Sequence, residues 1–209
     1  MTTLTTRTPA DAFDSAVRSR PTLRALTVVG AALLVLGATL GPLMIFDSRP
    51  YSELSATPQH LAHYAIWTAC LVALSQIYPR LAGLEGSSGR RVSAVAATVA
   101  AVGAALDACS RFLLAFVNPF LAAHEPALLD TAPDAILLVP SLGAGVVAMV
   151  GVIWLGVSGW RARAFPRPAV VLLVIGSLAI PAIGPLSNAL VGGGLLWIGI
   201  SLSRRRATA

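Results

Sequence analysis

Two ionisable residues, Asp107 and Arg111, interrupt a long run of alanine, valine, leucine and glycine. Because they are four residues apart, they share one face of a helix and can form an ion pair. A charged side chain at the centre of a membrane span costs about 2.5–3.5 kcal/mol, so such residues often mark functional sites. The sequence supports two interpretations: a self-neutralising structural pair, or an acid that faces a pocket while Arg111 extends to the outer interface.

A second group of polar and aromatic residues recurs at helical spacing. His60, His63, Tyr64 and Trp67 are three or four residues apart and therefore share one helical face. We interpret His63 as a candidate partner of Asp107 or of a ligand, and His60, Tyr64 and Trp67 as candidate binding residues. The alternative is a belt of residues at the membrane interface.

The segment that follows Arg111 adds phenylalanines and a helix breaker. Phe112, Phe116 and Phe120 recur every four residues, which suits either the wall of a lipophilic pocket or plain lipid contact. Asn118 is a further candidate binding residue, and Asn118-Pro119 is expected to interrupt the helix. The remaining residues, up to about 129, are expected to lie along the outer membrane surface as an amphipathic cap.

These residues support three functions in descending order. The first is a non-enzymatic membrane protein that binds a small amphipathic ligand or a partner through this outer-leaflet polar layer. The second is an enzyme, such as a membrane-bound cyclase, in which Asp107 and His63 perform acid–base chemistry on an isoprenoid- or lipid-like substrate. We rank the enzyme second because the nearby cation of Arg111 favours the charged form of the Asp107 carboxyl over the protonated form. The third is a small transporter subunit.

No motif indicates a metal or another cofactor. The three histidines and two cysteines lack the spacing of a zinc or haem site. The basic residues are scattered in short segments between apolar runs, which argues against a nucleic-acid partner.

Composition indicates a bilayer as the solvent. Of the 209 residues, 56% are hydrophobic and 11% are charged, and the mean hydropathy is +0.78. A soluble domain has about 25% charged residues. Residues 1–22 are polar and lack the apolar core of a signal peptide. The hydropathy outline is similar to that of small bacterial polytopic membrane proteins, and it assigns no role to any residue.

The apolar runs predict an all-α transmembrane bundle of about six helices. A span needs about 20 apolar residues. The expected spans are 24–46, 59–79, 92–117, 135–158, 168–184 and 187–203. The last two are short, and a re-entrant hairpin with a turn at 181–188 is the alternative.

The distribution of charge predicts the orientation. With six crossings, thirteen of the fifteen arginines lie on one side, in the segments 1–24, 80–91, 161–167 and 204–206. Arg49 lies opposite, among acidic residues. The positive-inside rule therefore places both termini in the cytoplasm and the protein in the cell membrane. We expect one transmembrane domain, 23–203, between a polar tail (1–22) and a basic tail (204–209).

Small residues and one cap predict local packing. Thr57 and Pro58 suit the N-cap and first position of the second span. Gly37 and Gly41 form a GxxxG pattern, and further glycines occur in the fourth span at 143, 145, 151 and 156. Such residues let helices approach closely, and we interpret them as packing within one chain rather than as evidence for a dimer.

Overall fold

The computed structural model describes residues 20–131 and 139–207, and they are almost entirely helical. The long helices are α2 (Arg20–Phe46), α4 (Pro58–Ile77), α5 (Ala94–His124), α7 (Val139–Arg161), α8 (Arg167–Ile183) and α9 (Ser187–Ala207). They are joined by the short helices α3 (Tyr51–Ser55) and α6 (Pro126–Thr131) and by the 3-10 turns η1 (Tyr78–Leu81) and η3 (Gly184–Leu186).

The helical prediction is confirmed, and the long helices lie at the expected spans, except that α5 runs beyond the predicted end at 117 to His124. Five helices are long and apolar enough to cross a bilayer, which fits a multi-pass membrane protein. The exception is α8, which has 17 residues and meets only the lower limit of length, so its crossing stays a prediction. Residues 1–19, 135–138 and 208–209 of the predicted segments lie outside the described residues.

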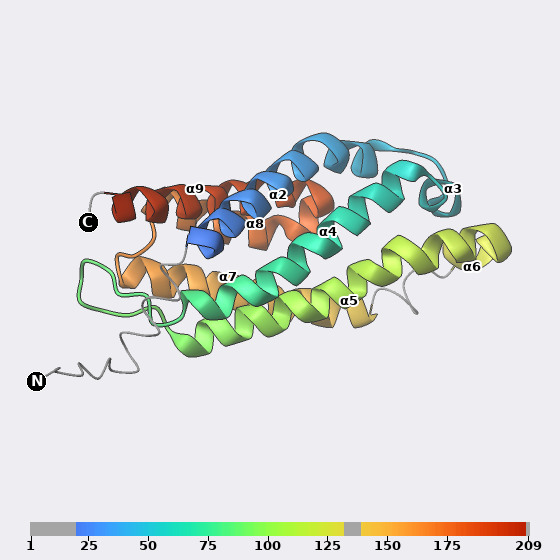
Figure 1. The fold of residues 1–209 in the computed structure, drawn as a ribbon. Helices are drawn as coiled ribbons and strands as arrows, with labels where there is room; N and C mark the ends of the chain where they lie inside the picture. Colours follow the sequence, from blue (N-terminus) through green and yellow to red (C-terminus); the bar gives the residue numbers. More distant parts are fainter. Residues whose placement is uncertain (1–19, 132–138, 208–209) are drawn as a thin grey trace, which may run out of the picture.

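The long helices form an up-and-down bundle (Figure 1). Each of them packs against the next one along the chain, and α9 closes the arrangement by packing against α2. The buried core between them includes Leu33, Leu74, Leu155 and Leu195. This alternation brings the start of α2 and the end of α9 to the same end of the bundle, as the six-crossing prediction requires.

Glycines make the closest helix contacts. A Cβ added to Gly30 or Gly37 would lie closer than 3.0 Å to the backbone of α9, and one added to Gly151 would meet the backbone of α5. Gly143 and Gly145 differ, because no atom lies within 4 Å of an added Cβ. The predicted packing within one chain is therefore confirmed for Gly37 and Gly151 but not for Gly143 and Gly145.

The N-terminus of α4 confirms its predicted cap. The Thr57 side chain accepts a hydrogen bond from the backbone N–H of His60 at 3.2 Å, and Pro58 occupies the first turn. This cap satisfies a helical N–H that would otherwise lack a partner.

The predicted interruption at Asn118-Pro119 is wrong. The helix α5 continues through Pro119 to His124, over 31 residues, or about 46 Å. Proline removes one backbone hydrogen bond, but α3 and α6 pack against this end of α5 and support it. Residues up to His124 thus extend α5 beyond the start of α4, and α6 follows it (Figure 1), while the position of this segment along the outer membrane surface stays a prediction.

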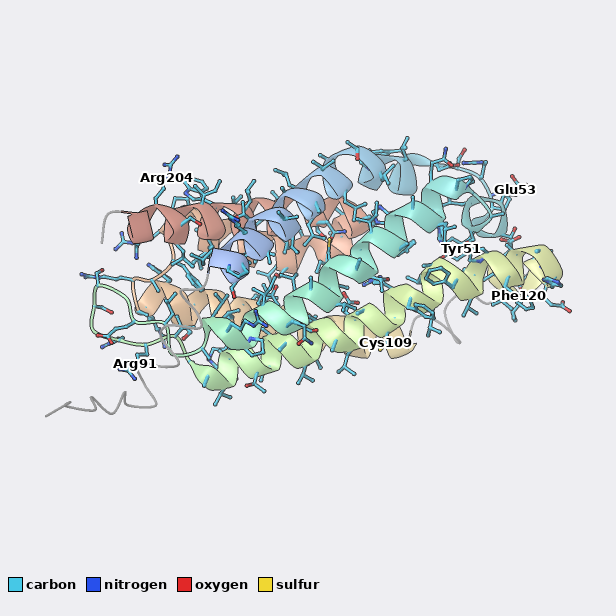
Figure 2. The ribbon with its side chains drawn as sticks, viewed as in Figure 1. Tyr51, Glu53, Arg91, Cys109, Phe120 and Arg204 are labelled. Atoms are coloured by element: carbon cyan, nitrogen blue, oxygen red, sulfur yellow. The ribbon has the colours of Figure 1, made fainter. Side chains whose placement is uncertain are left out.

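The two ends of the bundle carry opposite charge. Figure 2 shows Arg91 and Arg204 at one end and Glu53 at the other. Arg80, Arg161 and Arg167 lie at the same end as Arg91, at the ends of their helices. The arrangement matches the charge pattern that predicted the orientation.

Cysteine labelling in intact cells tests this orientation. In a Cys70→Ala/Cys109→Ala background, we expect Ser48→Cys to react with an impermeant thiol reagent from outside. Ser88→Cys and Ser203→Cys, which lie at the basic end, are expected to react only after permeabilisation. Reaction of Ser203→Cys in intact cells would contradict the crossing of both α8 and α9.

Alanine substitution tests the glycine contacts. Gly30→Ala forces a Cβ against the α9 backbone, and we expect it to destabilise the protein by about 1–3 kcal/mol. Gly143→Ala enters open space and is the matched control, with an expected change within about 0.5 kcal/mol. The measurement is unfolding of the purified protein in detergent, and equal effects of the two substitutions would contradict this packing.

Candidate functional site

The helix α4 places its histidines and aromatic residues against α5. His60, His63 and Trp67 are buried, and Tyr64 is half-buried. Their rings contact one another: the centroids of His63 and Trp67 are 5.6 Å apart, and Tyr64 and Trp67 stack with an interplanar angle of 13°. The predicted shared face is confirmed, and it packs inside the bundle instead of forming an interfacial belt.

Asp107 and Arg111 form an ion pair on the face of α5 that meets these rings. Nη2 of Arg111 lies 2.9 Å from Oδ1 of Asp107, and the side chains are 14% and 8% exposed. The guanidinium carbon also lies 4.2 Å from the centroid of the Trp67 ring, a distance typical of a cation–π contact. Of the two arrangements that the sequence allows, the structure has the ion pair, and Arg111 does not turn away from Asp107.

Polar atoms without a hydrogen-bond partner concentrate in this region. Among the described residues, seven of the eight such buried side-chain atoms belong to α3, α4 or α5. They are Ser55 Oγ, His60 Nδ1, both ring nitrogens of His63, Asp107 Oδ1, Arg111 Nε and Asn118 Oδ1. The contact of Asp107 Oδ1 with Arg111 is thus a charge contact without an aligned N–H. Each unsatisfied buried group costs about 1–3 kcal/mol of stability. Favourable packing in the rest of the bundle therefore compensates for the cost of these seven atoms.

The two histidines have different surroundings. Nε2 of His60 donates to the carbonyl of Leu114 at 3.1 Å, because a carbonyl can only accept. His63 is fully buried, and neither ring nitrogen has a partner among the described residues. The expected hydrogen bond from His63 to Asp107 is therefore absent.

Asn118 links α5 to the short helix α3. Its side-chain amide donates to the hydroxyl of Tyr51 at 2.8 Å, and the Tyr51 ring meets His60 edge to face at 5.9 Å. Burial raises the pKa of Tyr51, so the hydroxyl stays neutral at physiological pH. Asp130 of α6 accepts two hydrogen bonds from Ser52 at 2.9 and 2.8 Å. Asn118 thus helps to anchor α3 against α5.

A cavity of about 330 Å³ opens beside the ion pair. Three of the predicted residues line it: Tyr64, Trp67 and Arg111. The rest of its wall comes from α7, α8 and η3, at Ser141, Leu142, Gly145, Val146, Met149, Ile180, Gly184 and Pro185. Among the described residues of this lining, Arg111 is the charged one.

The other predicted site residues lie outside the cavity lining. Asp107, His60 and His63 are buried where α4 packs against α5, and Asn118 is buried where α5 contacts Tyr51 of α3. Phe112 and Phe116 are half exposed, and the centroids of their rings are 4.7 Å apart. Their outward position favours contact with lipid over a role in the pocket wall.

Sequence reasoning missed the wall contributed by α7 and η3. The only hint in the sequence is Gly145, because a glycine that does not pack against a neighbouring helix leaves space for a cavity. The open position of Gly145 cannot be distinguished from the packed position of Gly151 without the fold. In the described residues, no three metal-ligating side chains gather, and Cys70 and Cys109 are free.

No known protein family, curated protein or solved structure matches this chain. Any function is therefore argued from the chemistry of the chain's own residues.

Neutral substitutions test the ion pair. Asp107→Asn or Arg111→Gln alone leaves one buried charge without its partner, and we expect each to destabilise the protein by about 3–5 kcal/mol. The double variant removes both charges and is expected to recover most of this loss. Thermal unfolding in detergent measures the effect, and losses that simply add in the double variant would contradict the pairing.

The exposed pair Asp47–Arg49 provides a matched control. Hydrogen bonds from Arg49 lower the pKa of Asp47 to about 2, so the Asp47 carboxyl is charged at neutral pH. Because it lies in solvent, Asp47→Asn and Arg49→Gln are expected to leave the unfolding temperature nearly unchanged.

Proposed function

We propose that this protein is a multi-pass protein of the cell membrane that binds a small amphipathic molecule in the cavity beside Arg111. The single observation that carries the proposal is the position of the Arg111 guanidinium in the wall of an otherwise largely apolar cavity. A ligand that suits this wall has an apolar body and a head group with hydrogen-bond-accepting oxygens. A guanidinium offers donors to such a head group.

The location of the cavity supports access from the membrane. Leu142 and Val146 line it and are 56% and 52% exposed, on the outer surface of α7. In a bilayer this surface faces lipid, so an apolar molecule can reach the cavity sideways past Leu142 and Val146. The basic end of the bundle is expected in the cytoplasm, and the cavity lies at the opposite end, within the outer leaflet.

The geometry ranks binding above acid–base catalysis. An acid that protonates a lipophilic substrate must reach the substrate while carrying its proton. Asp107 is paired with Arg111 and does not line the cavity. His63 is likewise buried and does not line the cavity. Both candidates would need a rearrangement of α4 or α5 to act on a molecule in the cavity.

The size of the cavity limits the ligand. Pockets for small molecules usually measure about 300–1,000 Å³, and this one, at about 330 Å³, lies at the lower end. A single acyl or isoprenoid chain with a compact head group fits this description better than a bulky ring system. Trp67, in the wall, provides an intrinsic fluorescent reporter of occupancy.

Filling the cavity tests the proposal. The probe is cis-parinaric acid, a fluorescent fatty acid, followed by energy transfer from tryptophan to the probe in detergent-solubilised protein. Gly145→Leu adds a side chain to open space in the cavity wall, and we expect it to weaken binding at least tenfold, or about 1.4 kcal/mol. Gly143→Leu adds the same volume outside the lining and is expected to bind as the unmodified protein does.

The methyl ester of the same probe tests the role of Arg111. It keeps the apolar chain but removes the carboxylate charge, so we expect weaker binding than for the acid. Equal binding of acid and ester would contradict recognition of the head group by Arg111. Unchanged binding by Gly145→Leu would contradict the use of this cavity.

A further inference from the structure

A second cavity, of about 400 Å³, lies at the opposite end of the bundle, where α7 turns into α8. Four arginines line it, Arg161, Arg163, Arg167 and Arg205, together with Trp160. We call this the arginine pocket. Its lining differs from that of the cavity beside Arg111, which we call the outer cavity. Arginine side chains dominate the arginine pocket, whereas mostly apolar side chains line the outer cavity.

The turn that carries these arginines has a defined and strained geometry. The backbone N–H of Ala164 donates to the Gly159 carbonyl at 2.9 Å, and that of Arg163 donates to the Trp160 carbonyl at 2.8 Å. This is the Schellman pattern at a helix C-terminus, in which glycine is preferred at the left-handed position. Here Arg163 occupies that position, with φ of 57°. A non-glycine residue there costs roughly 1–2 kcal/mol.

Neighbouring segments fix this turn in place. The Ser88 hydroxyl donates to the Ala162 carbonyl at 2.8 Å. Nη1 of Arg205 donates to the carbonyls of Arg163 and Ala164 at 3.1 and 3.2 Å. The arginine side chains therefore project from a rigid backbone instead of a loose loop.

No acidic side chain of the described part of the chain neutralises the cluster. Among residues 20–131 and 139–207, Glu85 is the acidic residue at this end, and it pairs with Arg91 at 3.5 Å. Arg161, Arg163 and Arg167 are exposed and form no ion pair within residues 20–131 and 139–207. Their donors are available to an external anion.

Exposed apolar side chains also lie on α7 and α8, the two helices that meet at the arginine pocket. Trp160 and Trp154 of α7 are 46% and 45% exposed, and Val171 and Ile175 of α8 are 53% and 52% exposed. Tryptophan beside basic residues is typical of a membrane interface. An anion that also carries acyl chains would match both the charge and this surface.

We propose that the arginine pocket binds the phosphate-bearing head group of an anionic phospholipid, with the acyl chains along α7 and α8. Guanidinium groups suit phosphate because their planar donors can bind two oxygens at once. Arg163 supplies one of these groups from a position at which glycine would be more stable. This site is independent of the ligand of the outer cavity.

Lipid titration of the full-length protein tests this site. The protein is purified in a neutral detergent, and bound lipids are counted by native mass spectrometry. The probes are phosphatidylglycerol and the zwitterionic phosphatidylcholine. We expect phosphatidylglycerol to bind more tightly, and the variant Arg161→Gln/Arg163→Gln/Arg167→Gln to weaken its binding about tenfold or more, since each basic residue near an anionic lipid surface contributes roughly fivefold.

A matched control separates the pocket from general charge. Arg24→Gln/Arg90→Gln/Arg204→Gln removes three exposed arginines that lie at the same end but outside the arginine pocket. Because these side chains do not line the pocket, we expect this variant to weaken phosphatidylglycerol binding clearly less than the Arg161→Gln/Arg163→Gln/Arg167→Gln variant does. An equal loss in the two triple variants, or equal binding of the two lipids, would overturn the proposal.

Two further measurements distinguish loss of binding from loss of folding, and a lipid ligand from a soluble phosphate. Arg163→Gly relieves the backbone strain, so we expect it to unfold at the same or a higher temperature while binding phosphatidylglycerol less tightly. Unweakened lipid binding by this variant would contradict the role of Arg163. An excess of inorganic phosphate is expected not to displace the lipid, and displacement would identify a soluble phosphate as the ligand instead.

Discussion

The bundle depends on how it accommodates two opposite charges inside an apolar helix. Asp107 and Arg111 lie on the 31-residue helix α5, with side chains only 8% and 14% exposed, and an unpaired charge at such a buried position is costly. Their spacing lets them neutralise each other at 2.9 Å, and the Trp67 ring covers the guanidinium from α4. The pair therefore couples α4 to α5 and holds Arg111 in the wall of the outer cavity. If Arg111 turned away, Asp107 would remain as an uncompensated buried charge.

Packing changes character along the bundle. Toward the basic end, α5 contacts α7 through small residues such as Ala100 and Gly151, which bring the helices close together. Toward the acidic end, the contacts of α5 are with the large side chains of His60, His63 and Trp67. There α8 ends after 17 residues, and Gly145 leaves open space. The outer cavity is the result of this uneven filling, so its position follows from backbone length and side-chain volume.

Much of the fold could be predicted from sequence because lipid requires it. Continuous apolar runs of about 20 residues favour helices, and the arginine-rich connections predict their alternation. The N-cap at Thr57 and the shared face of His60, His63 and Trp67 depend on local spacing, and they were also predictable. By contrast, proline at 119 predicts a break, yet tertiary contacts with α3 and α6 keep α5 intact. Local propensity is a weaker term than packing at that point.

The candidate site was predictable only in part, for a similar reason. Spacing within one helix brought together Asp107 with Arg111, and Tyr64 with Trp67. The cavity wall from α7 and η3 depends on contacts between distant segments, and so does the link from Asn118 to Tyr51. A single sequence contains no signal that joins Gly145 to Pro185. The arginine pocket likewise combines residues from α7, α8 and α9.

The ionisation of Asp107 tests the central claim most directly, because a paired carboxylate is charged and a catalytic acid in an apolar site is protonated. Infrared difference spectra between the unmodified protein and Asp107→Asn, at neutral pH in lipid, report this state. The ion pair predicts loss of carboxylate bands in the variant and no loss of a protonated-carboxyl band. Disappearance of a protonated-carboxyl band in Asp107→Asn would contradict the pair and support an acid that acts on a substrate.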